Sequence, residues 1–218
     1  MNPVGYLVNS PQGLMGTRGQ FYSYIMAQNG VWVEARNDLL AARVLVSPGE
    51  VRGLKPLEPQ LALPGGKIPQ FFWELALSSL LADLSMERYV SITHHSTPLG
   101  REYRFSIPPQ DRSAGGVSYE RLPLTVLDLH SHPGMRAFFS GTDYRDEVGF
   151  QVYGVLGTLG GSYLTPEGVR AIDGLAIRLR VGIYGHFQEI PWSWVFSGNL
   201  MGCQDMNNLG VYHNTANE

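Results

Sequence analysis

The sequence predicts an α/β fold that contains both strands and helices and is preceded by a small β-rich N-terminal segment. Three observations support it. Residues 1–50 are rich in aromatic and β-branched residues, residues 70–86 have helical periodicity, and strand-like apolar runs follow residue 87. The chain has 218 residues, 44% of them hydrophobic, which suits one large domain or one domain with a small appendage.

Composition excludes several classes of protein. Charged residues make up 16% of the chain and the net charge is -3, so there is no basic surface typical of nucleic-acid binding. No apolar run is long enough to span a bilayer, and the first residues lack the pattern of a signal peptide. The single cysteine, Cys203, excludes an internal disulfide and a cysteine-built zinc site. We therefore expect a cytoplasmic protein.

The N-terminal segment, residues 1–65, reads as strands and turns. Within residues 19–36, two apolar runs are separated by Asn29-Gly30, a strong hairpin signal. Residues 41–47 predict a third strand. Five prolines then fall within residues 48–69, which predicts an irregular connection.

Residues 70–86 form the clearest helical pattern in the chain. Apolar side chains recur with a period of 3.6 residues, at Phe72, Leu75, Ala76, Leu80 and Leu84. The pattern is apolar on most of its circumference, so a core helix is expected. Glu87 follows directly, and residues 88–93 predict a strand.

The rest of the expected domain, which ends at residue 197, consists mainly of strands. They cover residues 122–132, 150–159 and 175–184, with a short helix at 141–149. In the last strand apolar residues alternate with Arg178 and Arg180, a pattern typical of a half-buried strand. Residues 198–218 are rich in Asn and Gly and predict a flexible polar tail.

The stretch from His130 to Asp143 carries the candidate chemistry. His130 and His132 are two residues apart on a strand, so both side chains share a face and can converge on one metal ion. Pro133 is expected to end the strand, Ser140 to cap a helix, and Asp143 to lie in its first turn. Two imidazoles and a carboxylate leave a fourth position for water, as in catalytic zinc sites. The two histidines alone would favour a simple packed pair.

The whole stretch resembles the JAMM motif, H-x-H-P-x6-S-x2-D, of the prokaryotic JAB branch of the MPN/JAB zinc metallopeptidases. The resemblance implies an MPN/JAB-like (cytidine-deaminase-like) sheet flanked by helices over residues 66–197. It also implies Zn2+ held by His130, His132 and Asp143, with Ser140 stabilising the oxyanion. The layout is similar to the protein A subgroup of PRTRC plasmid cassettes.

The family also uses an upstream glutamate at a helix-to-strand junction, the place that Glu87 occupies. The residues after that glutamate often run E-x-x-G-x-L-x-G, whereas this chain has Val90 and His94 at the glycine positions. Glu102 and Glu120 are therefore alternatives. Asp128 shares the face of His130, where it would either orient that histidine or be an ordinary polar residue.

The resemblance implies a hydrolase that cleaves a peptide or isopeptide bond at the C-terminal tail of a ubiquitin-like protein. E1-like (ubiquitin-activating-enzyme-like) proteins are candidate partners. Residues 94–119 are turn-rich and are either a flap that contacts the substrate or a plain surface loop. Two other functions stay open: a binding module that scaffolds a ubiquitin-like or E1-like partner, and a zinc hydrolase of small amides or nucleotides.

Overall fold

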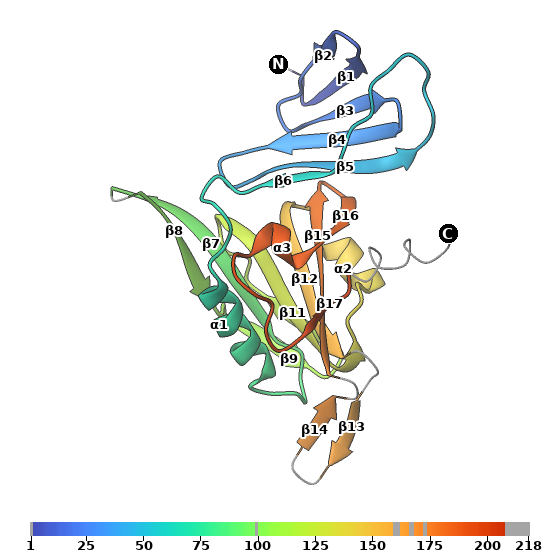
Figure 1. Cartoon of the computed structure of the whole chain (residues 1–218). Coiled ribbons are helices and arrows are strands. Elements are labelled where there is room, and N and C mark those ends of the chain that lie inside the picture. Colours follow the sequence, from blue (N-terminus) through green and yellow to red (C-terminus); the bar gives the residue numbers. More distant parts are fainter. Residues whose placement is uncertain (1, 99, 159–161, 166–167, 172–173, 208–218) are drawn as a thin grey trace.

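A computed structural model of the chain describes residues 2–98, 100–158, 162–165, 168–171 and 174–207 (Figure 1). Over these residues the protein is mostly β, with 52% in strands and 12% in three helices. The expected helix-flanked α/β architecture is therefore wrong. The structure instead consists of curled mixed sheets with few helices.

The N-terminal sheet contains six strands. They are β1 (Val4–Ser10), β2 (Gly13–Thr17), β3 (Tyr22–Ala27), β4 (Gly30–Arg36), β5 (Ala41–Pro48) and β6 (Gln60–Ala62). Their order is β2-β1-β3-β4-β5-β6, in which β1 and β3 are parallel and the other neighbours antiparallel. The hairpin at Asn29-Gly30, between β3 and β4, is confirmed.

The second sheet has the order β16-β15-β12-β11-β7-β8, with the short β17 pairing with β15. Its strands are β7 (Tyr89–Thr97), β8 (Gly100–Ser106), β11 (Thr125–Arg136), β12 (Phe150–Thr158), β15 (Leu175–Ile183), β16 (His186–Ile190) and β17 (Gln204–Asp205). Two separate hairpins accompany it: β9 (Gln110–Ser113) with β10 (Gly116–Tyr119), and β13 (Ser162–Thr165) with β14 (Gly168–Ala171).

The helices are short, which explains why the α/β expectation fails. The helix α1 (Gln70–Leu81) buries Trp73, Ala76 and Leu80 against the second sheet, but it ends five residues before the predicted end. The helices α2 (Gly141–Asp146) and α3 (Trp192–Val195) have six and four residues. Helical periodicity is confined to the region of α1, and the many β-branched and aromatic residues elsewhere favour strands.

The two sheets share one hydrophobic core. Val33 and Val44 of the first sheet belong to the same buried cluster as Leu179 and Val181 of the second. The expected boundary at residues 65–66 falls in the loop between β6 and α1. Figure 1 shows the first sheet covering the end of the second, beside β15 and β16. The N-terminal segment is thus packed on the domain that carries the motif.

Residues 198–207, expected to be part of a flexible polar tail, contact the rest of the domain. The buried carboxylate of Asp205, in β17, accepts a hydrogen bond of 2.7 Å from the Trp192 backbone N–H at the start of α3. The Met201 carbonyl accepts one of 3.2 Å from the Trp73 indole. Residues 198–207 therefore pack on the domain, and residues 208–218 lie outside the described residues. Among the residues described, none of the helices has the length and apolar character that crossing a membrane requires.

Candidate metal centre and active site

The strand β11 brings the two motif histidines together at the centre of the second sheet. His130 lies opposite Tyr89 of β7 and Val155 of β12, and both histidines are buried. Their Nε2 atoms are 3.1 Å apart. Contrary to expectation, Pro133 does not end the strand: β11 continues to Arg136 after a shift in register. Proline is tolerated at such an irregularity because no regular ladder bond is lost there.

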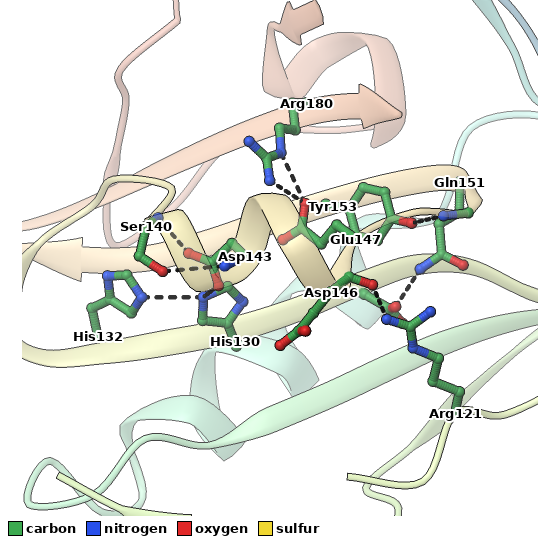
Figure 2. A network of polar contacts seen from close by, with 12 residues as sticks. Arg121, His130, His132, Ser140, Asp143, Asp146, Glu147, Gln151, Tyr153 and Arg180 are labelled. Atoms are coloured by element: carbon green, nitrogen blue, oxygen red, sulfur yellow. Dashed lines mark hydrogen bonds and ion pairs between the residues drawn. The ribbon is translucent and has the colours of Figure 1, made fainter. Parts of the chain in front are cut away.

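The first turn of α2 supplies the third candidate ligand. Ser140 is the N-cap, as predicted, and its Oγ accepts a 3.2 Å hydrogen bond from the Asp143 backbone N–H. In return the Asp143 carboxylate accepts a hydrogen bond from the Ser140 backbone N–H through Oδ2. This reciprocal capping fixes the carboxylate and leaves Oδ1 facing the histidines, 3.3 Å from His130 Nε2 (Figure 2).

The chemistry of these three side chains and two of their three ligand-atom separations fit a zinc ion. Their candidate ligand atoms all lie within 4.8 Å of one another. Ligands at about 2.05 Å in a tetrahedral site are about 3.3 Å apart, close to two of the separations seen here. Burial lowers the pKa of both His130 and His132, which keeps the imidazoles neutral at pH 7, the form that binds metal.

Glu87 faces the same site from the segment between α1 and β7. With His130, His132, Ser140 and Asp143 it lines one pocket of about 310 Å3. Glu87 is buried, and burial together with the nearby Asp143 carboxylate raises its pKa to about 7. A cation bound to the three ligands would lower that pKa by favouring the carboxylate. The structure thus places a carboxyl group suited to proton transfer beside the candidate metal ligands.

The two alternative glutamates lie elsewhere. Glu102 is an exposed residue of β8 that pairs with Arg104, and Glu120 is exposed after β10. Neither is among the described residues that line the pocket. His94 and His95 also lie away from it: the His94 ring is buried against Tyr103, and His95 Nε2 contacts the Thr93 hydroxyl at 2.8 Å.

The expected flap, residues 94–119, divides into two parts. Residues 94–106 mostly extend the second sheet as the β7–β8 pair. The β9–β10 hairpin contributes one wall of the pocket through four residues, Gly115, Gly116, Val117 and Tyr119. Only the second part therefore lies where a substrate in the pocket would contact it.

Asp128 does not take the role of orienting a ligand histidine. Its buried carboxylate accepts hydrogen bonds from the Tyr89 hydroxyl and the Gln151 amide. Burial raises the pKa of Asp128 to about 6, against the effect of those two hydrogen bonds. The Tyr119 ring stacks on Tyr89 at a centroid distance of 3.4 Å, which links this network to the β9–β10 hairpin.

Several residues around the site were missed by the sequence analysis. Glu147 lines the pocket and forms a buried ion pair with Arg180, although the alternation in residues 175–184 predicted a strand that is only half-buried. Tyr119 and Arg112 carried no recognised signal either. The one available hint was the density of aromatic residues just before and within α2, which surround Arg180.

Comparisons with known proteins do not assign the chain to a family. A scan against protein-family profiles finds none that matches the chain, and a search of curated proteins finds no similar sequence.

Proposed function

We propose that this protein is a zinc-dependent hydrolase of the JAMM metallopeptidase type, which cleaves a peptide or isopeptide bond. The observation that carries the proposal is the convergence of five residues on one pocket: the candidate ligands His130, His132 and Asp143, with Glu87 and Ser140 beside them. The resemblance of the sequence motif supports the same chemistry. The resemblance does not extend to the helix-flanked fold.

Each of the five residues has a role in this proposal. The two histidines and Asp143 would hold the zinc ion, which when bound would supply a water of low pKa and polarise a substrate carbonyl. Glu87 accepts the proton of the attacking water and passes it to the leaving amine. The Ser140 hydroxyl donates a hydrogen bond to the carbonyl oxygen as that oxygen gains negative charge.

The proposed substrate is the C-terminal tail of a ubiquitin-like protein. Such a tail is thin and extended, and it binds through main-chain hydrogen bonds to an exposed strand. The strand β10 supports this choice because it pairs with β9 on one side and contributes Gly116 and Val117 to the pocket wall. The proposed setting is the cytoplasm, where E1-like proteins are candidate partners.

Metal content and hydrolysis together test this function. Purified protein should contain one zinc per chain and cleave a linear fusion of ubiquitin to a short peptide. The His132→Ala variant should lose both zinc and cleavage, because two remaining ligands hold zinc poorly. The matched control is His186→Ala, a half-buried histidine of β16 that should keep both. Equal zinc in the two variants would reject the ligand assignment.

If the protein binds zinc but cleaves only small amides, the proposed ubiquitin-like substrate is wrong and the proposed zinc hydrolase activity stands. A protein with no zinc that still binds a ubiquitin-like or E1-like partner would instead support the scaffold function.

A further inference from the structure

The backbone around Glu87 is held by hydrogen bonds from two different parts of the structure. Glu87 lies outside any helix or strand, two residues before β7 begins. Arg88, the next residue, donates through its N–H to Ser131 Oγ at 3.0 Å and accepts at 2.9 Å from the Ser131 N–H. Ser131 separates the two candidate histidine ligands on β11. The Arg88 backbone is therefore hydrogen-bonded to β11, the strand that carries both candidate histidine ligands.

The β9–β10 hairpin holds the other side of the segment. The Glu87 N–H donates to the Ser113 carbonyl at 2.8 Å, and the Glu87 carbonyl accepts from Arg112 Nε at 2.9 Å. Two residues after Glu87, the Tyr89 backbone N–H donates to Gln110 Oε1 at 2.9 Å, and the Tyr89 carbonyl accepts from Gln110 Nε2 at 3.0 Å. Both backbone groups of Glu87 are thus bonded to residues of β9.

Arg112 connects three parts of this arrangement. Its Nη2 donates to the Asp83 carboxylate at 2.8 Å, so the side chain spans the turn between α1 and β7. Its neighbour across the hairpin is Val117, which lines the pocket. The strand β10, which lines the pocket, and the strand β9, which is hydrogen-bonded to Glu87, are therefore paired with each other in one hairpin.

We propose that the β9–β10 hairpin fixes the position of Glu87 in the pocket, and that Arg112 is the positioning residue through which it does so. This inference rests on the proposed function for its catalytic consequence. A tail bound along β10 presses on the same hairpin that holds the base, so substrate binding and placement of the base are coupled. Misplacement of a catalytic group by about 1 Å costs on the order of 100-fold in rate.

The first test measures amide hydrogen exchange in the metal-free protein and needs no activity. In Arg112→Gln the Glu87 amide should exchange at least about tenfold faster, because its partner strand is no longer anchored. The Arg88 amide, bonded to Ser131, should keep its protection and serves as the internal control. Asp83→Asn, which frees the other end of Arg112, should act in the same direction but less. Unchanged exchange at Glu87 in both variants overturns the proposal.

The second test measures hydrolysis of the ubiquitin–peptide fusion. Arg112→Gln should lower kcat by about 10- to 100-fold with zinc content unchanged, and Arg112→Lys should retain part of the activity. Arg104→Gln is the matched control, an exposed arginine of β8 that pairs with Glu102. The double variant Glu87→Gln/Arg112→Gln should be no slower than Glu87→Gln alone, since Arg112 acts through Glu87.

If the fold-losses of kcat in the two single variants multiply in the double variant, Arg112 acts independently of Glu87 and the positioning role is wrong. A wild-type protein without zinc or hydrolysis rejects the proposed function, and in that case the exchange experiment still decides whether Arg112 holds Glu87.

Discussion

Arg180 and Glu147 form a buried ion pair at the C-terminal end of α2. Arg180 Nε and Nη2 both donate to Glu147 Oε2, at 2.8 and 2.6 Å (Figure 2). The guanidinium also lies 3.8, 4.1 and 4.2 Å from the ring centroids of Phe139, Phe187 and Tyr144. Glu147 is the C-cap of α2, so the pair anchors the helix whose first turn carries Asp143.

Replacing Arg180 by methionine should destabilise the protein and loosen the candidate metal site. Burial raises the pKa of Glu147 and the Arg180 guanidinium opposes that rise, so the variant leaves a buried carboxyl without its partner. The free energy of unfolding should fall by about 3–5 kcal/mol in urea denaturation. Zinc affinity should fall by at least about tenfold, because the support of Asp143 is disturbed.

Arg178→Met is the matched control for that experiment. Arg178 lies two residues away on β15 and pairs with Glu189 at 2.9 Å, but both side chains are substantially exposed. An exposed pair of this kind contributes less than about 1 kcal/mol. Similar losses in the two variants would contradict the assignment of structural importance to the buried pair.

The Glu87→Gln variant should separate catalysis from metal binding. The amide keeps the size of the side chain and removes the base, so hydrolysis should fall by about 100- to 10,000-fold while zinc content stays the same. Glu120→Gln, at the exposed alternative position, should leave both unchanged. Normal turnover in Glu87→Gln, measured with the ubiquitin–peptide fusion, would move the search for the base to another residue.

The parts of the site that depend on neighbouring residues could be predicted from the sequence. Alternation along a strand placed His130 and His132 on one face, and capping preferences placed Ser140 and Asp143 in the first turn of α2. Both inferences need only residues within about a dozen positions. Glu87 was chosen because the family that the motif resembles uses a glutamate before a core strand, but the helix expected to end beside it ends at Leu81.

The parts that depend on distant segments could not be predicted. The alternation around Arg180 indicated one solvated face, but β15 is buried on both sides, between aromatic residues and the first sheet. Asp205 read as part of a loose tail, and its burial depends on a bond to Trp192. The flanking helices were expected from the resemblance of one motif, which constrains the site and not the layers around it.

Asp128 should make the stability of the metal-free protein depend on pH. Its pKa in the folded protein is about 6, above the ordinary value of 3.8, because burial disfavours the charged form. Its stabilising contribution is therefore complete below about pH 4 and is lost as the pH rises through 6. The two pKa values correspond to a loss of about 3 kcal/mol over that range.

Comparison with Asp128→Asn isolates this effect, because the histidines titrate in both proteins. Urea denaturation between pH 4 and 8 gives the unfolding free energy of both proteins. The value for the wild type minus the value for Asp128→Asn should fall as the pH rises to about 7 and stay constant above it. A difference that does not vary with pH would show that Asp128 keeps an ordinary pKa in the folded protein.

A bulky substitution at Val117 should distinguish an extended tail from a small substrate. Val117 lines the pocket from β10, and an arginine there would obstruct a chain lying along this strand. The KM for the ubiquitin–peptide fusion should rise at least about tenfold, which corresponds to about 1.4 kcal/mol of lost binding. Zinc content should not change, since the candidate ligands lie on β11 and α2.

Ser118→Arg is the control because Ser118, the next residue on β10, is not among the pocket's lining residues. Equal KM values for the two variants would place the substrate groove away from β10, and the N-terminal sheet would be the next surface to test.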